Sequence, residues 1–133
     1  MNQPAEVASG IALLLRDVRN STVGRHDEPP AFVVVLPPPA LSNERLAVRF
    51  QDFLPHGQER AVEVGKAIRA LIEQDRKAFE KHGMQVVVAD VSAAETGLDG
   101  LHFTAKGSRQ LGAIVAECIL TKFDGFPAYA KLC

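Results

Sequence analysis

The chain has 133 residues, of which 47% are hydrophobic and 23% charged, and its formal net charge at pH 7 is -1. This length suits one domain with one core, and the composition is too apolar for a disordered chain. A net charge this close to zero does not favour electrostatic binding of nucleic acid. We therefore expect a single domain over residues 1–133 and no nucleic-acid partner.

The amino-terminal residues carry no targeting signal that we can identify. The start of the chain has no basic stretch, and the apolar run from Ile11 to Leu15 is too short for a signal peptide or a membrane span. The two cysteines, Cys118 and Cys133, form neither a disulfide framework nor a metal-binding spacing. We expect a cytoplasmic protein without a membrane partner, with one core thiol and one thiol in the tail.

The first predicted element is an amphipathic helix from Ala5 to about Asn20. Its apolar residues recur at helical spacing, and charged residues fall on or beside the other face; the apolar positions are Val7, Ile11, Leu14, Leu15 and Val18. The polar segment 20–30 that follows contains glycine and two prolines, which predicts a loop. His26 and Asp27 in this loop are interpreted as solvated residues.

Residues Phe32 to Leu36 form a continuous apolar, mostly β-branched run, which predicts a strand of a parallel sheet that is buried on both faces. Three prolines follow this run. Open parallel sheets usually bind ligands at the carboxyl ends of their strands. We therefore expect Pro38 at the rim of a substrate site, which is compatible with a second role for the prolines as a rigid connector.

The segment 42–57 predicts a short helix and a turn, because its apolar residues are numerous but poorly periodic. Two phenylalanines in it, Phe50 and Phe53, are candidates for the wall of an acyl-binding pocket. Aromatic residues at this spacing also occur as simple core residues, and the sequence leaves both interpretations open.

A long helix is predicted from Gln58 to Lys81, followed by a glycine cap at Gly83. The second β-branched run, 84–90, comes directly after it. A strand, a helix and a strand in this order form a right-handed crossover unit, so both strands should be parallel neighbours.

Asp99 and His102 lie three residues apart on the loop between this second strand and the last predicted helix. An aspartate so placed can accept a hydrogen bond from one ring nitrogen of the histidine and leave the other nitrogen free as a general base. Thr104 is a candidate N-cap for a helix that runs to Phe123. The predicted order of elements is αβαβα, and the pair lies at the edge of the sheet where ligands bind.

Read as a unit, the strand 86–90, the loop and the motif Asp99-Gly-Leu-His102-Phe-Thr-Ala-Lys-Gly107 resemble the C-terminal block of the SGNH (GDSL-type) hydrolases. The strand and proline loop 33–38 resemble the esterase and acyl-CoA thioesterase branch of that family. The resemblance implies a three-layer, flavodoxin-like α/β fold with a parallel sheet. It also implies that Asp99 and His102 complete a catalytic triad for hydrolysis of esters or thioesters, without a cofactor or metal.

The sequence departs from the family in its nucleophile. It contains no Gly-Asp-Ser block and no Gly-x-Asn-Asp block, and none of its serines matches a nucleophile block; these are Ser9, Ser21, Ser42, Ser92 and Ser108. The expectation is therefore a C-terminal portion of such an enzyme, which carries the base and its orienting acid and is nearly inactive alone. It should associate with itself or with its missing N-terminal half.

Two other hypotheses remain open at this point. One is a non-catalytic α/β module for binding or assembly, for which no sequence feature selects a ligand. The other is a metal site built from Asp99, His102 and either His26 or Asp90, which would have to be brought together from distant loops.

Overall fold

A computed structural model of the chain describes residues 3–38, 57–97 and 102–123. Along these ranges the elements are α1 (Pro4–Arg19), a single 3-10 turn η1 (Arg25–Asp27), β1 (Phe32–Val35), α3 (Gly57–Lys81), β2 (Gln85–Val88) and α4 (Ala105–Lys122). The predicted order αβαβα is confirmed for this part of the chain. The predicted short helix within 42–57, with Phe50 and Phe53, lies outside the described residues.

The two strands pair in parallel, with Phe32 beside Gln85 and Val35 beside Val88. Two hydrogen bonds bracket the ladder: Gln85 N–H donates to Ala31 C=O at 2.8 Å, and Ala89 N–H donates to Val35 C=O at 2.9 Å. In a parallel pair, alternate residues direct both backbone groups at the partner strand. The backbone groups of Ala31, Val33 and Val35 therefore face β2, and those of Val34 face away from it.

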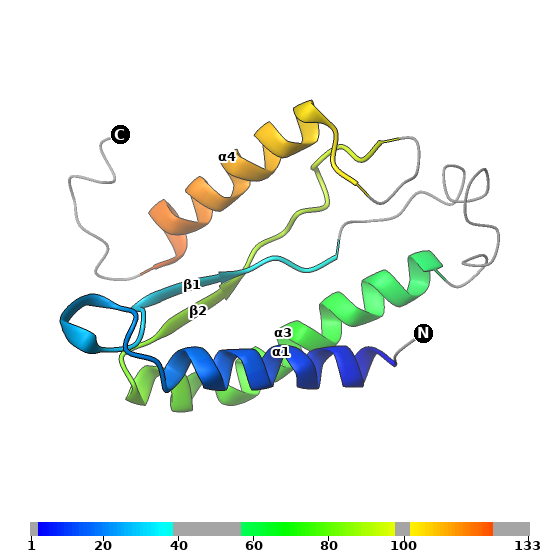
Figure 1. Ribbon diagram of the computed structural model, residues 1–133. Helices are drawn as coiled ribbons and strands as arrows, with labels where there is room; N and C mark the ends of the chain where they lie inside the picture. The colour runs from blue at the N-terminus through cyan, green and yellow to red at the C-terminus, as the bar shows by residue number, and fades with distance from the viewer. Residues whose placement is uncertain (1–2, 39–56, 98–101, 124–133) are drawn as a thin grey trace.

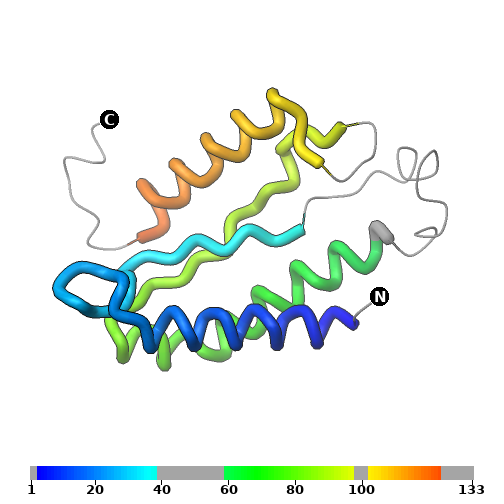
Figure 2. The backbone as a smooth tube through the Cα atoms, in the orientation of Figure 1, coloured from blue at the N-terminus to red at the C-terminus, as the bar shows by residue number. Residues whose placement is uncertain are grey.

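Helices lie on both sides of the strand pair (Figure 1). Helices α1 and α3 run side by side on one side, and α4 is the one helix of the described ranges on the other, as the tube in Figure 2 also shows. The main core lies between the strands and the α1–α3 pair, and its buried members are Ala8, Leu15, Val35, Val64, Ile68, Ile72, Phe79 and Met84. The described residues thus form a mixed α/β fold around a two-stranded parallel sheet.

The expected burial of 32–36 on both faces is met only in part. Val35 is buried against the α1–α3 core, but Phe32, Val33 and Val34 are half-buried and Leu36 is 46% exposed. On the α4 side, the Phe32 ring meets the Phe123 ring with centroids 5.0 Å apart. In the described ranges β1 has a strand neighbour on one edge only, and this is why its side chains are less covered than those of a central strand.

The helix ends follow from local chemistry. Pro4 opens α1, and the Glu6 carboxylate accepts a hydrogen bond from Gln3 N–H at 3.0 Å. Gly83 has a φ of 74° directly after α3, as the predicted glycine cap requires. None of the helices in the described ranges is long and apolar enough to cross a membrane.

Candidate functional site

The carboxyl end of β2 leads into a tight turn that fixes the carboxylate of Asp90. Ser92 N–H donates to Asp90 Oδ1 at 3.0 Å. The Ser92 hydroxyl and this N–H hold the pKa of Asp90 below its ordinary value, and the positive charge of Arg69 adds a smaller effect in the same direction. Asp90 is therefore an ionised, exposed carboxylate just beyond the carboxyl end of β2.

After this turn the chain doubles back on itself. Thr96 and Phe103 form an antiparallel bridge, and Gly97 N–H donates to His102 C=O at 2.7 Å. Thr104 N–H donates to Glu95 C=O at 3.2 Å on the other side of the bridge. The two arms of the loop are thus tied together by backbone hydrogen bonds next to His102.

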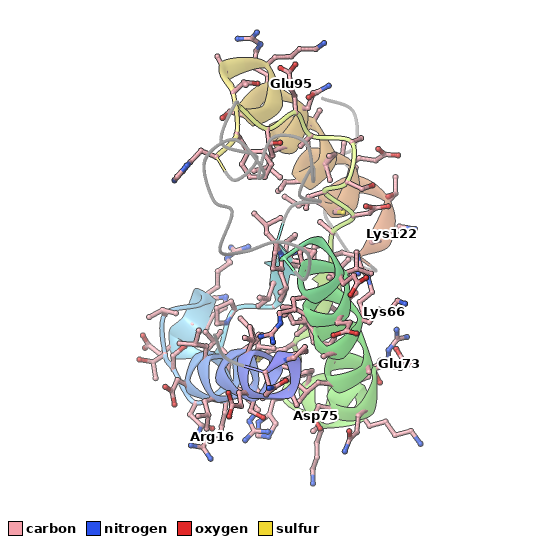
Figure 3. All side chains as sticks on the ribbon, turned by 90° about the vertical axis from the view of Figure 1, so that its right-hand side faces the viewer. Arg16, Lys66, Glu73, Asp75, Glu95 and Lys122 are labelled. Atoms are coloured by element: carbon pink, nitrogen blue, oxygen red, sulfur yellow. The ribbon has the colours of Figure 1, made fainter. Side chains whose placement is uncertain are left out.

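Side-chain hydrogen bonds connect this loop to the first turn of α4. The Thr104 hydroxyl donates to Glu95 Oε2 at 2.7 Å and accepts from Gly107 N–H at 2.9 Å, so it is the N-cap that the sequence predicts. Glu95 N–H in turn donates to Gln110 Oε1 at 2.9 Å. Figure 3 shows Glu95 beside the start of α4, with Lys122 at the far end of that helix. We call Glu95, Thr104, Gly107 and Gln110 the loop clamp.

Gly107 is the member of the loop clamp with the least freedom to change. It is buried, and a Cβ at this position would overlap the carbonyl group of Glu95. Only glycine allows the backbone of the loop to approach the helix this closely. This close approach explains why the motif 99–107 ends in glycine.

His102 itself is exposed and directly precedes Phe103 of the antiparallel bridge, two residues before the N-cap of α4. Its backbone C=O accepts the hydrogen bond from Gly97 N–H. Asp99, its predicted orienting acid, lies outside the described residues, so the distance between the two side chains stays a prediction.

Pro38 is exposed and follows β1, at the same end of the sheet as the turn after β2. With Pro37 it lines an open hollow of about 210 Å³ whose other walls come from α3 and from the 90–92 turn; these residues are Ala61, Val62, Gly65, Lys66, Arg69, Asp90, Val91 and Ser92. The predicted place of Pro38, at the rim of a cavity at the carboxyl ends of the strands, is therefore compatible with the structure. His102 is not among the residues that line this hollow.

The thiol of Cys118 is free and half-buried rather than fully enclosed in the core. In the ranges 3–38, 57–97 and 102–123, no group of three or more histidine, cysteine, aspartate or glutamate residues could hold a metal ion. His26 lies on the exposed turn η1 with a φ of 59°.

Sequence reasoning missed most of the loop clamp and the two cations of the hollow. Thr104 was predicted as a cap, but Glu95 and Gln110 are separated from it by loop and helix residues and carry no local signal. Gly107 does carry a local signal. Glycine in the first turn of a helix lowers helix stability, so its presence there indicates a close packing contact. Lys66 and Arg69 look like ordinary surface residues of a long amphipathic helix.

Comparisons of the chain with models of protein families, with curated proteins and with solved structures give no match. The resemblance of the segment 99–107 to the SGNH hydrolases is therefore a prediction from the sequence alone.

Proposed function

We propose that this chain supplies the acid-base part of an SGNH-type serine ester hydrolase site, with His102 as the general base and Asp99 as its orienting acid. The nucleophilic serine and the oxyanion donors would come from a segment outside this sequence. His102 would accept the serine proton during attack on an ester or thioester carbonyl and return it to the leaving group. Asp99 would hold the ring and stabilise the imidazolium.

One observation carries the proposal: the hydrogen bond from Gly97 and the loop clamp fix the backbone at His102 and directly after it, while the residue stays exposed on the loop that follows the carboxyl end of β2. A general base must be held in one place and yet be reachable by its proton donor. A histidine that served only to pack the start of α4 would be covered by its neighbours.

The pair can be tested without the missing nucleophile, because an aspartate that accepts from Nδ1–H selects one tautomer of the neutral ring. We expect ¹⁵N NMR of the neutral His102 ring to show the proton on Nδ1. In Asp99→Asn the side-chain amide can donate to Nδ1, so the population should shift toward the tautomer with the proton on Nε2. Glu73→Gln, which changes a carboxylate on the outer surface of α3, is the matched control. A His102 tautomer that Asp99→Asn leaves unchanged would remove the orienting role.

The reaction itself is tested by hydrolysis of p-nitrophenyl acetate. The chain alone should be nearly inactive, because loss of triad function typically lowers turnover by roughly a million-fold. Fusion to a segment that carries Gly-Asp-Ser and Gly-x-Asn-Asp blocks should produce activity that His102→Ala abolishes. Hydrolysis by the unfused chain that disappears on His102→Ala would show that the nucleophile is already present. A fused protein indifferent to both Asp99 and His102 would favour the alternative, a non-catalytic module.

A further inference from the structure

The hollow lined by Pro37 and Pro38 combines apolar and charged lining residues. The apolar ones are the prolines together with Ala61, Val62 and Val91, and the charged ones are Lys66, Arg69 and Asp90. It opens where the two parallel strands end, which is the usual place for a ligand in a sheet of this kind.

Arg69 is not extended freely into solvent. A Cβ built on Gly65, one turn earlier in α3, would lie 3.3 Å from Arg69 Nη1 and 3.8 Å from Pro37 Cβ. The guanidinium therefore lies back over the bare backbone of Gly65, beside the hollow. Glycine is unfavourable in the interior of a helix. The buried Gly65 thus lowers the stability of α3 but leaves space for the Arg69 guanidinium.

The donors of Arg69 are not used by the part of the chain that the structure describes. Neither Arg69 nor Lys66 has a hydrogen bond or an ion pair there, although Arg69 is close enough to Asp90 for electrostatic attraction. Asp90 already accepts hydrogen bonds from the N–H and hydroxyl groups of Ser92, so it does not need the guanidinium to satisfy it. The two cations and one carboxylate leave a net positive charge on the lining of the hollow. Figure 3 shows this end of the sheet toward the viewer, with Lys66 on α3.

We propose that this hollow binds a small organic anion, with its carboxylate or phosphate head on Arg69 and Lys66 and a short apolar body against Pro37, Pro38 and Val62. The planar fork of arginine suits both kinds of head, because each can accept two parallel hydrogen bonds. Lys66 lines the same hollow and adds a second positive charge three residues before Arg69 in α3. This site goes beyond the proposed ester hydrolase and does not depend on it, because His102 does not line it.

The test is an NMR titration of the whole chain with butyrate, butyl phosphate and uncharged butanol. We expect saturable shifts at the amides of Gly65 and Val91 with at least one of the two anions and much weaker shifts with butanol. Arg69→Gln should weaken anion binding roughly 10- to 100-fold, since a charge-assisted hydrogen bond is lost. Lys77→Gln, which removes an exposed cation from the same helix outside the hollow, is the matched control and should leave the affinity unchanged.

Gly65→Ala provides a second variant that separates binding from folding. The added methyl group favours the helix but crowds Arg69 Nη1, so anion affinity should fall although the fold is kept. Preference for butyrate or for butyl phosphate identifies the head group, and either result supports the site. The proposal is overturned if neither anion gives saturable shifts, if butanol binds as well as the anions, or if Lys77→Gln weakens binding as much as Arg69→Gln does.

Discussion

The hydroxyl of Thr104 donates to the carboxylate of Glu95 at 2.7 Å and at the same time caps the first turn of α4. One side chain thus joins the loop after β2 to the helix that follows it. His102 lies between these two residues along the chain, so this contact helps to hold the backbone next to it.

We predict that the contact between Thr104 and Glu95 is energetically coupled. Thr104→Val should lower the free energy of unfolding by about 1–2 kcal/mol through loss of the N-cap and of the donor to Glu95. In a double-mutant cycle with Glu95→Ala, the coupling energy should be roughly 0.5–1.5 kcal/mol, measured by urea unfolding. Thr104→Ser keeps the hydroxyl and should retain most of the stability.

The control cycle pairs Glu95→Ala with Thr121→Val. The Thr121 hydroxyl donates to Glu117 C=O near the other end of α4 and does not touch the loop clamp. These two changes should be additive. Coupling as large in the control cycle as in the first would mean that the variants perturb the whole helix, and the specific contact would then be excluded as the cause.

Two glycines of α4 should respond in opposite directions to alanine. Gly107→Ala forces a methyl group into the Glu95 carbonyl and should lower the free energy of unfolding by roughly 1–3 kcal/mol. Gly112→Ala, on the same helix with open space around it, should raise it by about 0.5–1 kcal/mol. Urea unfolding measures both, and a neutral Gly107→Ala would show that the loop is not held against the helix as described.

The turn at Asp90 predicts a small dependence of stability on pH. The folded pKa of Asp90 lies below its unfolded value, so the stabilisation is complete above the unfolded pKa of about 4 and is lost as the pH falls through the folded pKa. Ser92→Ala removes the hydroxyl hydrogen bond. The pKa of Asp90 should therefore rise, and the difference in stability between pH 7 and pH 3 should shrink.

Carboxyl titration by NMR measures this pKa directly. Ser9→Ala is the control, because the Ser9 hydroxyl donates to Ala5 C=O within α1 and is far along the chain from the turn. If Asp90 has the same pKa in Ser92→Ala and in the unchanged chain, a group other than the Ser92 hydroxyl lowers that pKa.

The outward edge of β1 predicts association through strand pairing. The N–H of Val34 faces away from β2 and has no partner in the described ranges, and Leu36 beside it is 46% exposed. Such an edge is a template for another strand. We expect the chain to self-associate as its concentration rises, and the Val34 amide to become protected from hydrogen exchange with it.

Val35 is the internal control for this measurement. Its backbone groups face β2, so its amide should be protected at every concentration. Sedimentation gives the size of the assembly. A monomer at high concentration with a strongly protected Val34 amide would show that a segment of the same chain already covers this edge.

The sequence by itself determined the order of the described elements and the parallel pairing of the two strands. The periodicity of α1 and α3, the β-branched runs of β1 and β2, the glycine cap at Gly83 and the N-cap at Thr104 are local signals, because each depends on the preferences of neighbouring residues. The crossover rule then made the strands parallel and placed Pro38 and the turn at Asp90 at one end of the sheet.

Only the tertiary structure decided which residues meet at that end. Glu95 and Thr104 are nine positions apart, and Gly65 and Pro37 lie on different elements, so their contacts depend on how the loop and α3 pack against the strands. The half-exposed state of β1 has the same origin, since a β-branched run indicates a strand but not how many neighbours it has. Sequence patterns record what a residue prefers locally, whereas burial and hydrogen-bond partners are set by segments that pack together across the fold.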